Sequence, residues 1–137
     1  MSRPTPGTYI ITNKARSTEG NELTITFNGK GNALTVDNRT DSPSQRWKIS
    51  NYSDGRTSYV VPVSAPSLQV AWGRGVAIVL PAGAYVWTIR ETRTGYTIQD
   101  GGLTAFWGVA HTVDGAKVTI GGGTGEVTQR WHLKRVA

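Results

Sequence analysis

Three segments of this 137-residue chain follow one pattern, and this internal repeat restricts the possible folds more than any other feature. Each segment closes on a Trp that stands among strand-forming residues. The closing residues are Trp47, Trp87 and Trp131, which are 40 and 44 residues apart. A single repeat of this length buries its apolar face only against its neighbours, so we expect the three units to share one core.

Each unit holds four runs with the alternating, β-branched character of strands. The first runs begin at Tyr9, Tyr59 and Tyr96. The other three runs of each unit follow in order: 23–27, 33–36 and 45–49; 68–72, 76–80 and 85–89; 103–107, 117–120 and 129–133. Val and Ile total 21 against six Leu, which favours sheets over helices. The chain is therefore predicted to be all-β, with twelve strands in three pseudo-symmetric four-strand units and almost no helix beyond single turns.

The stretches between these runs have the composition of tight turns. Four dipeptides are typical of hairpins: Asn28-Gly29, Asp54-Gly55, Asp100-Gly101 and Asp114-Gly115. No linker or change of composition divides the chain. We predict one domain over residues 1–137, with units at about 7–50, 57–90 and 95–136.

The composition argues against several classes of protein. The absence of Cys excludes disulfides, thiolate metal sites and a Cys nucleophile. The two histidines, His111 and His132, are isolated from any catalytic or metal-ligand pattern, so we expect no enzyme activity, no metal and no cofactor. The 15 basic residues outnumber the nine acidic ones but are scattered, so we expect no nucleic-acid partner.

The hydropathy of the chain gives no sign of a membrane or secretory segment. No run approaches 18 consecutive apolar residues, so membrane insertion is not expected. The stretch from Met1 to Gly7 contains no apolar core of a signal peptide. These features predict a cytoplasmic protein.

The closing strands carry a recognisable motif. Gln-Arg-Trp occurs at 45–47 and 129–131, and the middle unit has Tyr85 where the other two have Gln. Three such repeats of about 40 residues resemble the ricin-B-type β-trefoil, which implies that fold for nearly the whole chain. We expect Trp47 and Trp131 to fill the core and each Gln amide to bond backbone groups of the preceding loop.

A longer set of stretches resembles the small β-trefoil lectins of fungal fruiting bodies, and in particular the inky-cap mushroom lectins that recognise α1,3-fucosylated N-glycan cores. These stretches are 7–11, 68–75, 79–81, 85–88 and 95–101. The resemblance implies a non-catalytic lectin for fucosylated or GlcNAc-containing glycans of glycoproteins or glycolipids, with a role in fungal defence and a monomeric or weakly homodimeric state. It also implies binding roles at Tyr52, Trp72, Leu80, Tyr85, Val86 and Trp87.

The residues themselves favour a sugar site on the middle unit. Trp72 is followed by Gly73, Arg74 and Gly75, which would leave its ring uncovered, and Arg74 is a candidate polar contact. In a regular strand, Tyr85 and Trp87 would share one face. Two alternatives stay open for Trp87, which is either part of this aromatic shelf or a core residue.

Other positions limit the specificity of the expected site. Tyr52 lies in a loop and is either a sugar contact or ordinary turn packing. Ala84 stands where the resemblance implies an Asn, so one amide contact to the glycan is lost. The Asp of ordinary ricin-type sites is replaced by Thr24, Gln69 and Thr104, which disfavours three equivalent galactose sites. Asp100-Gly-Gly102 is interpreted as a turn.

The alternative function is protease inhibition through an exposed loop, which some fungal β-trefoils perform. The best candidate loop spans residues 37–43 and contains Arg39. Arg56 and Arg93 are further candidates for the primary contact with a trypsin-like protease.

Overall fold

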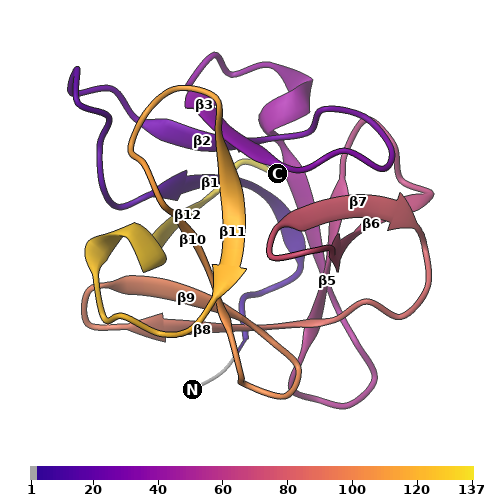
Figure 1. Cartoon of the computed structure of the whole chain (residues 1–137). Coiled ribbons are helices and arrows are strands. Elements are labelled where there is room, and N and C mark those ends of the chain that lie inside the picture. Colours follow the sequence, from indigo (N-terminus) through magenta and orange to yellow (C-terminus); the bar gives the residue numbers. More distant parts are fainter. Residues whose placement is uncertain (1–2) are drawn as a thin grey trace.

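The computed structural model describes residues 3–137 and consists of strands joined by turns (Figure 1). The strands of the first unit are β1 (Gly7–Asn13), β2 (Leu23–Thr26), β3 (Thr35–Asn38) and β4 (Trp47–Asn51). Those of the second are β5 (Ser58–Pro62), β6 (Leu68–Trp72), β7 (Ala77–Pro81) and β8 (Trp87–Thr92). Those of the third are β9 (Gly95–Asp100), β10 (Phe106–Val109), β11 (Ala116–Gly121) and β12 (Trp131–Arg135). Two single 3-10 turns, η1 (Pro43–Gln45) and η2 (Val127–Gln129), precede β4 and β12.

The prediction of an all-β chain with twelve strands and only single helical turns is confirmed. Several strands begin later than the predicted runs: β3 begins at Thr35, and β4, β8 and β12 begin at their closing Trp residues. The run 103–107 yields β10 only from Phe106, because Leu103 has a φ of +60° and its N–H donates to the Asp100 carbonyl at 3.1 Å. The turn chemistry of Asp100 therefore prevails over the apolar pattern at the start of this run.

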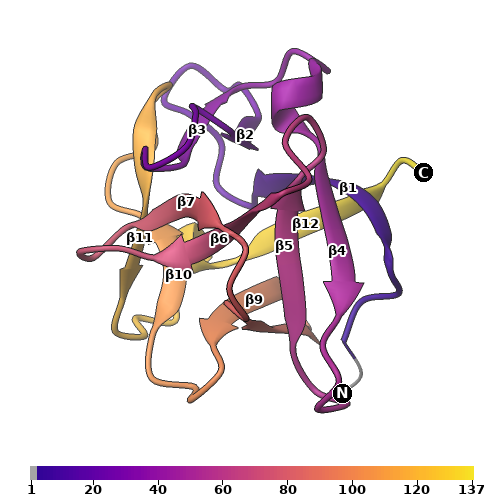
Figure 2. The ribbon, with the colours of Figure 1, turned by 90° about the vertical axis from the view of Figure 1, so that its right-hand side faces the viewer.

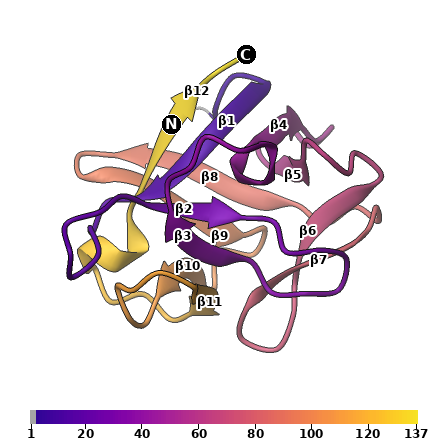
Figure 3. The same cartoon turned by 90° about the horizontal axis from the view of Figure 1, so that it is seen from above.

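Six strands close into a barrel. The first and last strands of each unit pair in the cyclic order β1, β12, β9, β8, β5 and β4, and β4 returns to β1. Figure 3 shows β1 and β12 side by side at one end of this ring. The remaining strands form three hairpins, β2–β3, β6–β7 and β10–β11. Closure of the barrel leaves no free edge in its wall.

The β6–β7 hairpin forms a two-stranded sheet of its own. It lies on the right-hand side in Figure 1, and Figure 2 turns that side toward the viewer. Isolated bridges join Ile78 to Ala33 and Val76 to Thr119 in the other two hairpins, and the Gly31 N–H donates to the Val79 carbonyl at 2.6 Å. The hairpin is also anchored through Val70 and Val79, which are buried in the core.

The three closing Trp residues occupy equivalent places in the core. The side chains of Trp47, Trp87 and Trp131 are at most 2% exposed. Each indole N–H donates to a carbonyl of the second strand of its own unit: Ile25 at 3.0 Å, Val70 at 2.9 Å and Trp107 at 3.1 Å. A buried indole that bonds in this way satisfies its only polar group. The repeat in the sequence thus corresponds to a repeated packing unit.

Candidate functional site

The Gln residues of the outer units hold the loops that precede the closing strands. The Gln45 side chain accepts a hydrogen bond from the Thr40 N–H at 2.9 Å and donates to the Asn38 carbonyl at 3.0 Å. Gln129 makes the same two contacts, five and seven residues earlier, with the Thr124 N–H at 2.9 Å and the Gly122 carbonyl at 2.8 Å. The predicted role of the Gln amide is therefore observed in both units.

The middle unit lacks this Gln and folds differently at the same point. The amide oxygen of Gln69 on β6 accepts hydrogen bonds from the N–H groups of Gly83 at 3.2 Å and Tyr85 at 3.3 Å. Ala84 has a φ of +55°, which is incompatible with a 3-10 turn. The chain therefore has no such turn before β8, and Tyr85 lies outside the strand. Its side chain is 37% exposed, whereas Gln129 at the equivalent position is 8% exposed.

Two aromatic rings are exposed beside each other in this unit. Trp72 is 46% exposed, and together with Tyr85 it lines a depression of about 250 Å³. Ala84, Val86, Trp87 and Asp100 complete the lining. Among the large apolar side chains exposed in residues 3–137, Trp72 and Tyr85 are the aromatic ones. The structure therefore brings together four of the predicted site residues, Trp72, Tyr85, Val86 and Trp87.

The glycines around Trp72 serve the turn that presents it. The Gly73 N–H donates to the Val76 carbonyl at 2.8 Å, and a Cβ on Gly73 would lie 2.8 Å from the side chain of Ile78. Gly75 has a φ of +69°, a conformation that glycine adopts without strain. The Gly73–Gly75 turn is therefore tight, and its two glycines carry no side chain that could cover the Trp72 ring. Arg74 is exposed at its tip but does not line the depression.

Trp87 lies beneath the depression. It is 2% exposed, and its ring meets that of Trp107 edge to face at a centroid distance of 4.9 Å. The expectation that Tyr85 and Trp87 share one face of a regular strand does not hold, because β8 begins only at Trp87. Of the two alternatives for Trp87, its hydrogen bond and burial place it in the core, with one edge reaching the site.

The other predicted site residues lie outside the depression. Tyr52 packs edge to face on Tyr59, with ring centroids 5.5 Å apart, and its carbonyl accepts a hydrogen bond from Arg3 at 2.8 Å. Leu80 is half-buried on β7 opposite Gln69. Like Gly73 and Arg74, these two side chains are absent from the lining.

Asp100 lines the site although the sequence pattern indicates only a turn. Its carboxylate accepts hydrogen bonds from the N–H of Thr104 at 2.7 Å, the N–H of Ala105 at 2.8 Å and the hydroxyl of Thr104 at 2.8 Å. Burial favours the neutral acid, but these hydrogen bonds together outweigh it and lower the pKa of Asp100.

The register of the β8–β9 hairpin brings Asp100 to the site. Thr92 pairs with Gly95, so the hairpin turn consists of Arg93 and Thr94. That register places Asp100 opposite Trp87. Residues 90–95 contain neither Asn-Gly nor Asp-Gly, so no hairpin dipeptide in the sequence marks this two-residue turn.

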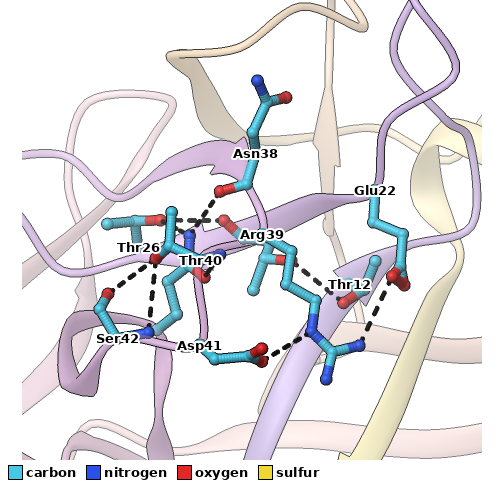
Figure 4. A network of polar contacts seen from close by, with 10 residues as sticks. Thr12, Glu22, Thr26, Asn38, Arg39, Thr40, Asp41 and Ser42 are labelled. Carbon is cyan, nitrogen blue, oxygen red and sulfur yellow. Dashed lines mark hydrogen bonds and ion pairs between the residues drawn. The ribbon is translucent and has the colours of Figure 1, made fainter.

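The loop at 37–43, the candidate inhibitory loop, is held against the protein. The guanidinium of Arg39 lies 3.0 Å from Asp41 and 3.5 Å from Glu22, and the hydrogen bond to Asp41 contributes most to raising the pKa of Arg39 (Figure 4). The Thr40 hydroxyl donates to Ser42 at 3.0 Å in the same network. Arg39 is therefore not presented as a free primary contact for a protease.

Neither a metal-binding cluster nor a membrane-spanning helix is found in the part of the chain that the structure describes. Within residues 3–137, no group of three or more His, Cys, Asp or Glu side chains is arranged to hold a metal ion. In the same part of the chain, no helix is long and apolar enough to span a bilayer.

Comparisons with solved structures identify the fold. A designed threefold-symmetric protein, ThreeFoil, superposes with a TM-score of 0.78 at 18% identity, covering 95% of this chain and 99% of its own. The ricin B-like lectin of Macrolepiota procera, solved in complex with lactose, gives a TM-score of 0.74 at 17% identity and covers 99% of this chain and 100% of its own. These likenesses confirm the predicted β-trefoil.

A larger protein contains the same fold as one part. A mosquitocidal holotoxin matches with a TM-score of 0.85 at 14% identity over 98% of this chain, which spans only 18% of the holotoxin. No curated protein matches the sequence. The model of the CCL2 lectin-like family matches residues 7–131. The chain therefore belongs to the CCL2 lectin-like family of carbohydrate-binding β-trefoils.

Proposed function

We propose that the chain binds fucosylated or GlcNAc-containing glycans, without catalysis, through the depression of Trp72 and Tyr85. Membership of a lectin family supports carbohydrate binding. The observation that carries the choice of site is the exposure of two aromatic rings, 46% and 37%, over one depression. Exposed aromatic rings that share one depression are typical of a binding site.

The chemistry of the depression suits a pyranose ring. The C–H face of a sugar packs on an aromatic plate, and its hydroxyls require fixed hydrogen-bond partners at the edge. The depression, about 250 Å³, is smaller than the roughly 300–1,000 Å³ of ordinary small-molecule pockets. It would therefore hold one sugar unit while the rest of the glycan stays in solvent.

Such a shallow site gives weak binding to one glycan. Useful avidity would come from clustered glycans on glycoproteins or glycolipids, bound by several copies or by a weak homodimer. The proposed role is defence of a fungus by a protein stored in the cytoplasm and released when an animal feeds. This role is supported by the resemblance to fruiting-body lectins.

Quenching of Trp fluorescence tests the proposal. Wild-type protein is titrated with chitobiose (GlcNAc-β1,4-GlcNAc), with α1,3-fucosylated chitobiose and with lactose. We expect saturable quenching by the GlcNAc-containing ligands and its loss in Trp72→Ala. The control is Val127→Ala, which truncates another exposed apolar side chain, 53% exposed, outside the depression.

Two results would refute the proposal. One is an unchanged affinity of Trp72→Ala for the GlcNAc-containing ligands, since the site would then lie elsewhere. The other is the absence of glycan binding by the wild type together with inhibition of trypsin or papain, which would favour the protease-inhibitor alternative.

A further inference from the structure

Asp100 brings a negative charge to the rim of the aromatic depression. It is the last residue of β9, pairs with Trp87 across the β8–β9 hairpin and lines the same depression as Trp72 and Tyr85. The turn that follows packs against the site, since a Cβ on Gly101 would lie 3.6 Å from the side chain of Val86. Asp100 therefore comes from the third unit to a depression whose other lining residues all belong to the second.

The hydrogen bonds that this carboxylate already accepts leave few of its acceptor positions free. A carboxylate offers about four acceptor positions on two oxygens. One Asp100 oxygen, Oδ1, accepts the N–H groups of Thr104 and Ala105, and Oδ2 accepts the Thr104 hydroxyl. About one position therefore remains, on Oδ2, and it can accept only from a hydroxyl, an amide N–H or an ammonium group.

The charge on this carboxylate is maintained and lacks a partner of opposite sign. Three hydrogen-bond donors stabilise the ionised form, and the pKa of Asp100 is lowered accordingly. None of the ion pairs found in residues 3–137 includes Asp100. A ligand group with a negative charge would therefore be repelled at this rim, whereas a neutral hydrogen-bond donor would be attracted.

We propose that Asp100 determines the charge specificity of the site: it accepts one hydrogen bond from a neutral or cationic sugar and excludes sugars that carry a carboxylate at this rim. The inference rests on the proposed function, because it assigns a ligand class to the same depression. It does not depend on which neutral sugar binds most tightly.

Three disaccharides and two variants test this inference. The ligands are chitobiose, GlcNAc-β1,4-MurNAc, which carries a lactyl carboxylate, and the methyl ester of that same MurNAc compound. The ester keeps the shape of the lactyl group and removes its charge. Affinities are measured by titration calorimetry for the wild type, Asp100→Asn and Asp54→Asn.

Asp54→Asn is a matched control for the structural role of Asp100. Asp54 also accepts two backbone N–H bonds and one Thr hydroxyl, from Arg56 and Thr57, in a turn that does not line the depression. Both variants remove one carboxylate charge from a turn of this kind. Thermal melting of the two variants shows whether each remains folded.

We expect the wild type to bind the ester about tenfold more tightly than the carboxylate, as two like charges in partial contact with solvent would produce. In Asp100→Asn this ratio should fall to near one, with weaker binding of chitobiose and stronger binding of the carboxylate. Asp54→Asn should keep the wild-type ratio. If the role of Asp100 were purely structural, Asp100→Asn would lower the affinity for all three ligands together and leave the ratio of ester to carboxylate affinity unchanged.

The failure of this inference differs from the failure of the proposed function. Equal binding of ester and carboxylate by a wild type that binds chitobiose overturns the role of Asp100 and leaves the proposed site intact. An unchanged ratio in Asp100→Asn does the same. If the wild type binds none of the three ligands and no fucosylated chitobiose, the proposed function and this inference both fall.

Discussion

Replacing Trp87 and Trp72 separately by Phe tests which of the two side chains stabilises the core. Trp87 is 2% exposed and donates its indole N–H to the Val70 carbonyl at 2.9 Å. Phe removes that hydrogen bond, at a cost of about 0.5–1.5 kcal/mol, and leaves a void that costs about 1 kcal/mol. The free energy of unfolding should therefore fall by about 2 kcal/mol. Trp72→Phe should change it by less than about 0.5 kcal/mol, because that ring is 46% exposed.

Urea denaturation followed by circular dichroism measures both variants. With a urea dependence of roughly 1–3 kcal/mol per molar, the midpoint of Trp87→Phe should shift down by about 1 M. Trp47→Phe should behave like Trp87→Phe, since its indole makes the equivalent bond to Ile25 at 3.0 Å. Equal losses of unfolding free energy in Trp72→Phe and Trp87→Phe would refute the assignment of Trp87 to the core.

Two further predictions concern the loop before β8, and a third concerns the turn between β4 and β5. A Cβ on Gly83 would lie 3.1 Å from the ring of Tyr85, so Gly83→Ala should displace that ring and weaken glycan binding severalfold in calorimetry, with little change in the melting temperature. Ala84 has a φ of +55°, which Asn adopts more readily than Ala, so Ala84→Asn should raise the melting temperature and tighten glycan binding by up to about tenfold if its amide bonds the sugar. Either variant behaving in the opposite way would contradict this geometry. The hydrogen bonds from Thr57 lower the pKa of Asp54 from 3.8 to about 2, with a smaller effect of the nearby charge of Arg56. Stability from this carboxylate is therefore complete above pH 3.8 and lost as the pH falls toward 2, so the thermal midpoint should decline over this interval less steeply in Asp54→Asn than in the wild type.

The three-unit architecture is predictable from the sequence because one packing unit, built on a buried Trp, recurs. Trp47 and Trp131 follow a Gln that bonds the preceding loop, and the same three-residue pattern appears in both outer units. β-Branched runs and Asp-Gly or Asn-Gly turns add the strands between them. The predicted strand starts are less accurate, as at Leu103, whose N–H donates to the Asp100 carbonyl, and before Trp87, where β8 begins.

The site is less predictable because it depends on departures from the repeat. The exposure of Trp72 follows from its position before a tight glycine turn, which the sequence displays. The outward turn of Tyr85 depends on the left-handed conformation of Ala84 and on Gln69, and neither is signalled by alternation along a strand. Asp100 belongs to the neighbouring unit, so only the register of the β8–β9 hairpin brings it to the depression.

The five Trp side chains test most directly whether the middle unit binds the glycan. Each indole N–H gives a separate signal in a ¹H–¹⁵N correlation spectrum, assigned by single Trp→Phe variants. On titration with α1,3-fucosylated chitobiose, the Trp72 signal should shift most and the Trp87 signal less. The signals of Trp47 and Trp131, whose indoles are bonded inside the outer units, should stay in place. Shifts confined to Trp107 or Trp131 during saturable binding, with the Trp72 signal unmoved, would show that the glycan binds outside the middle unit.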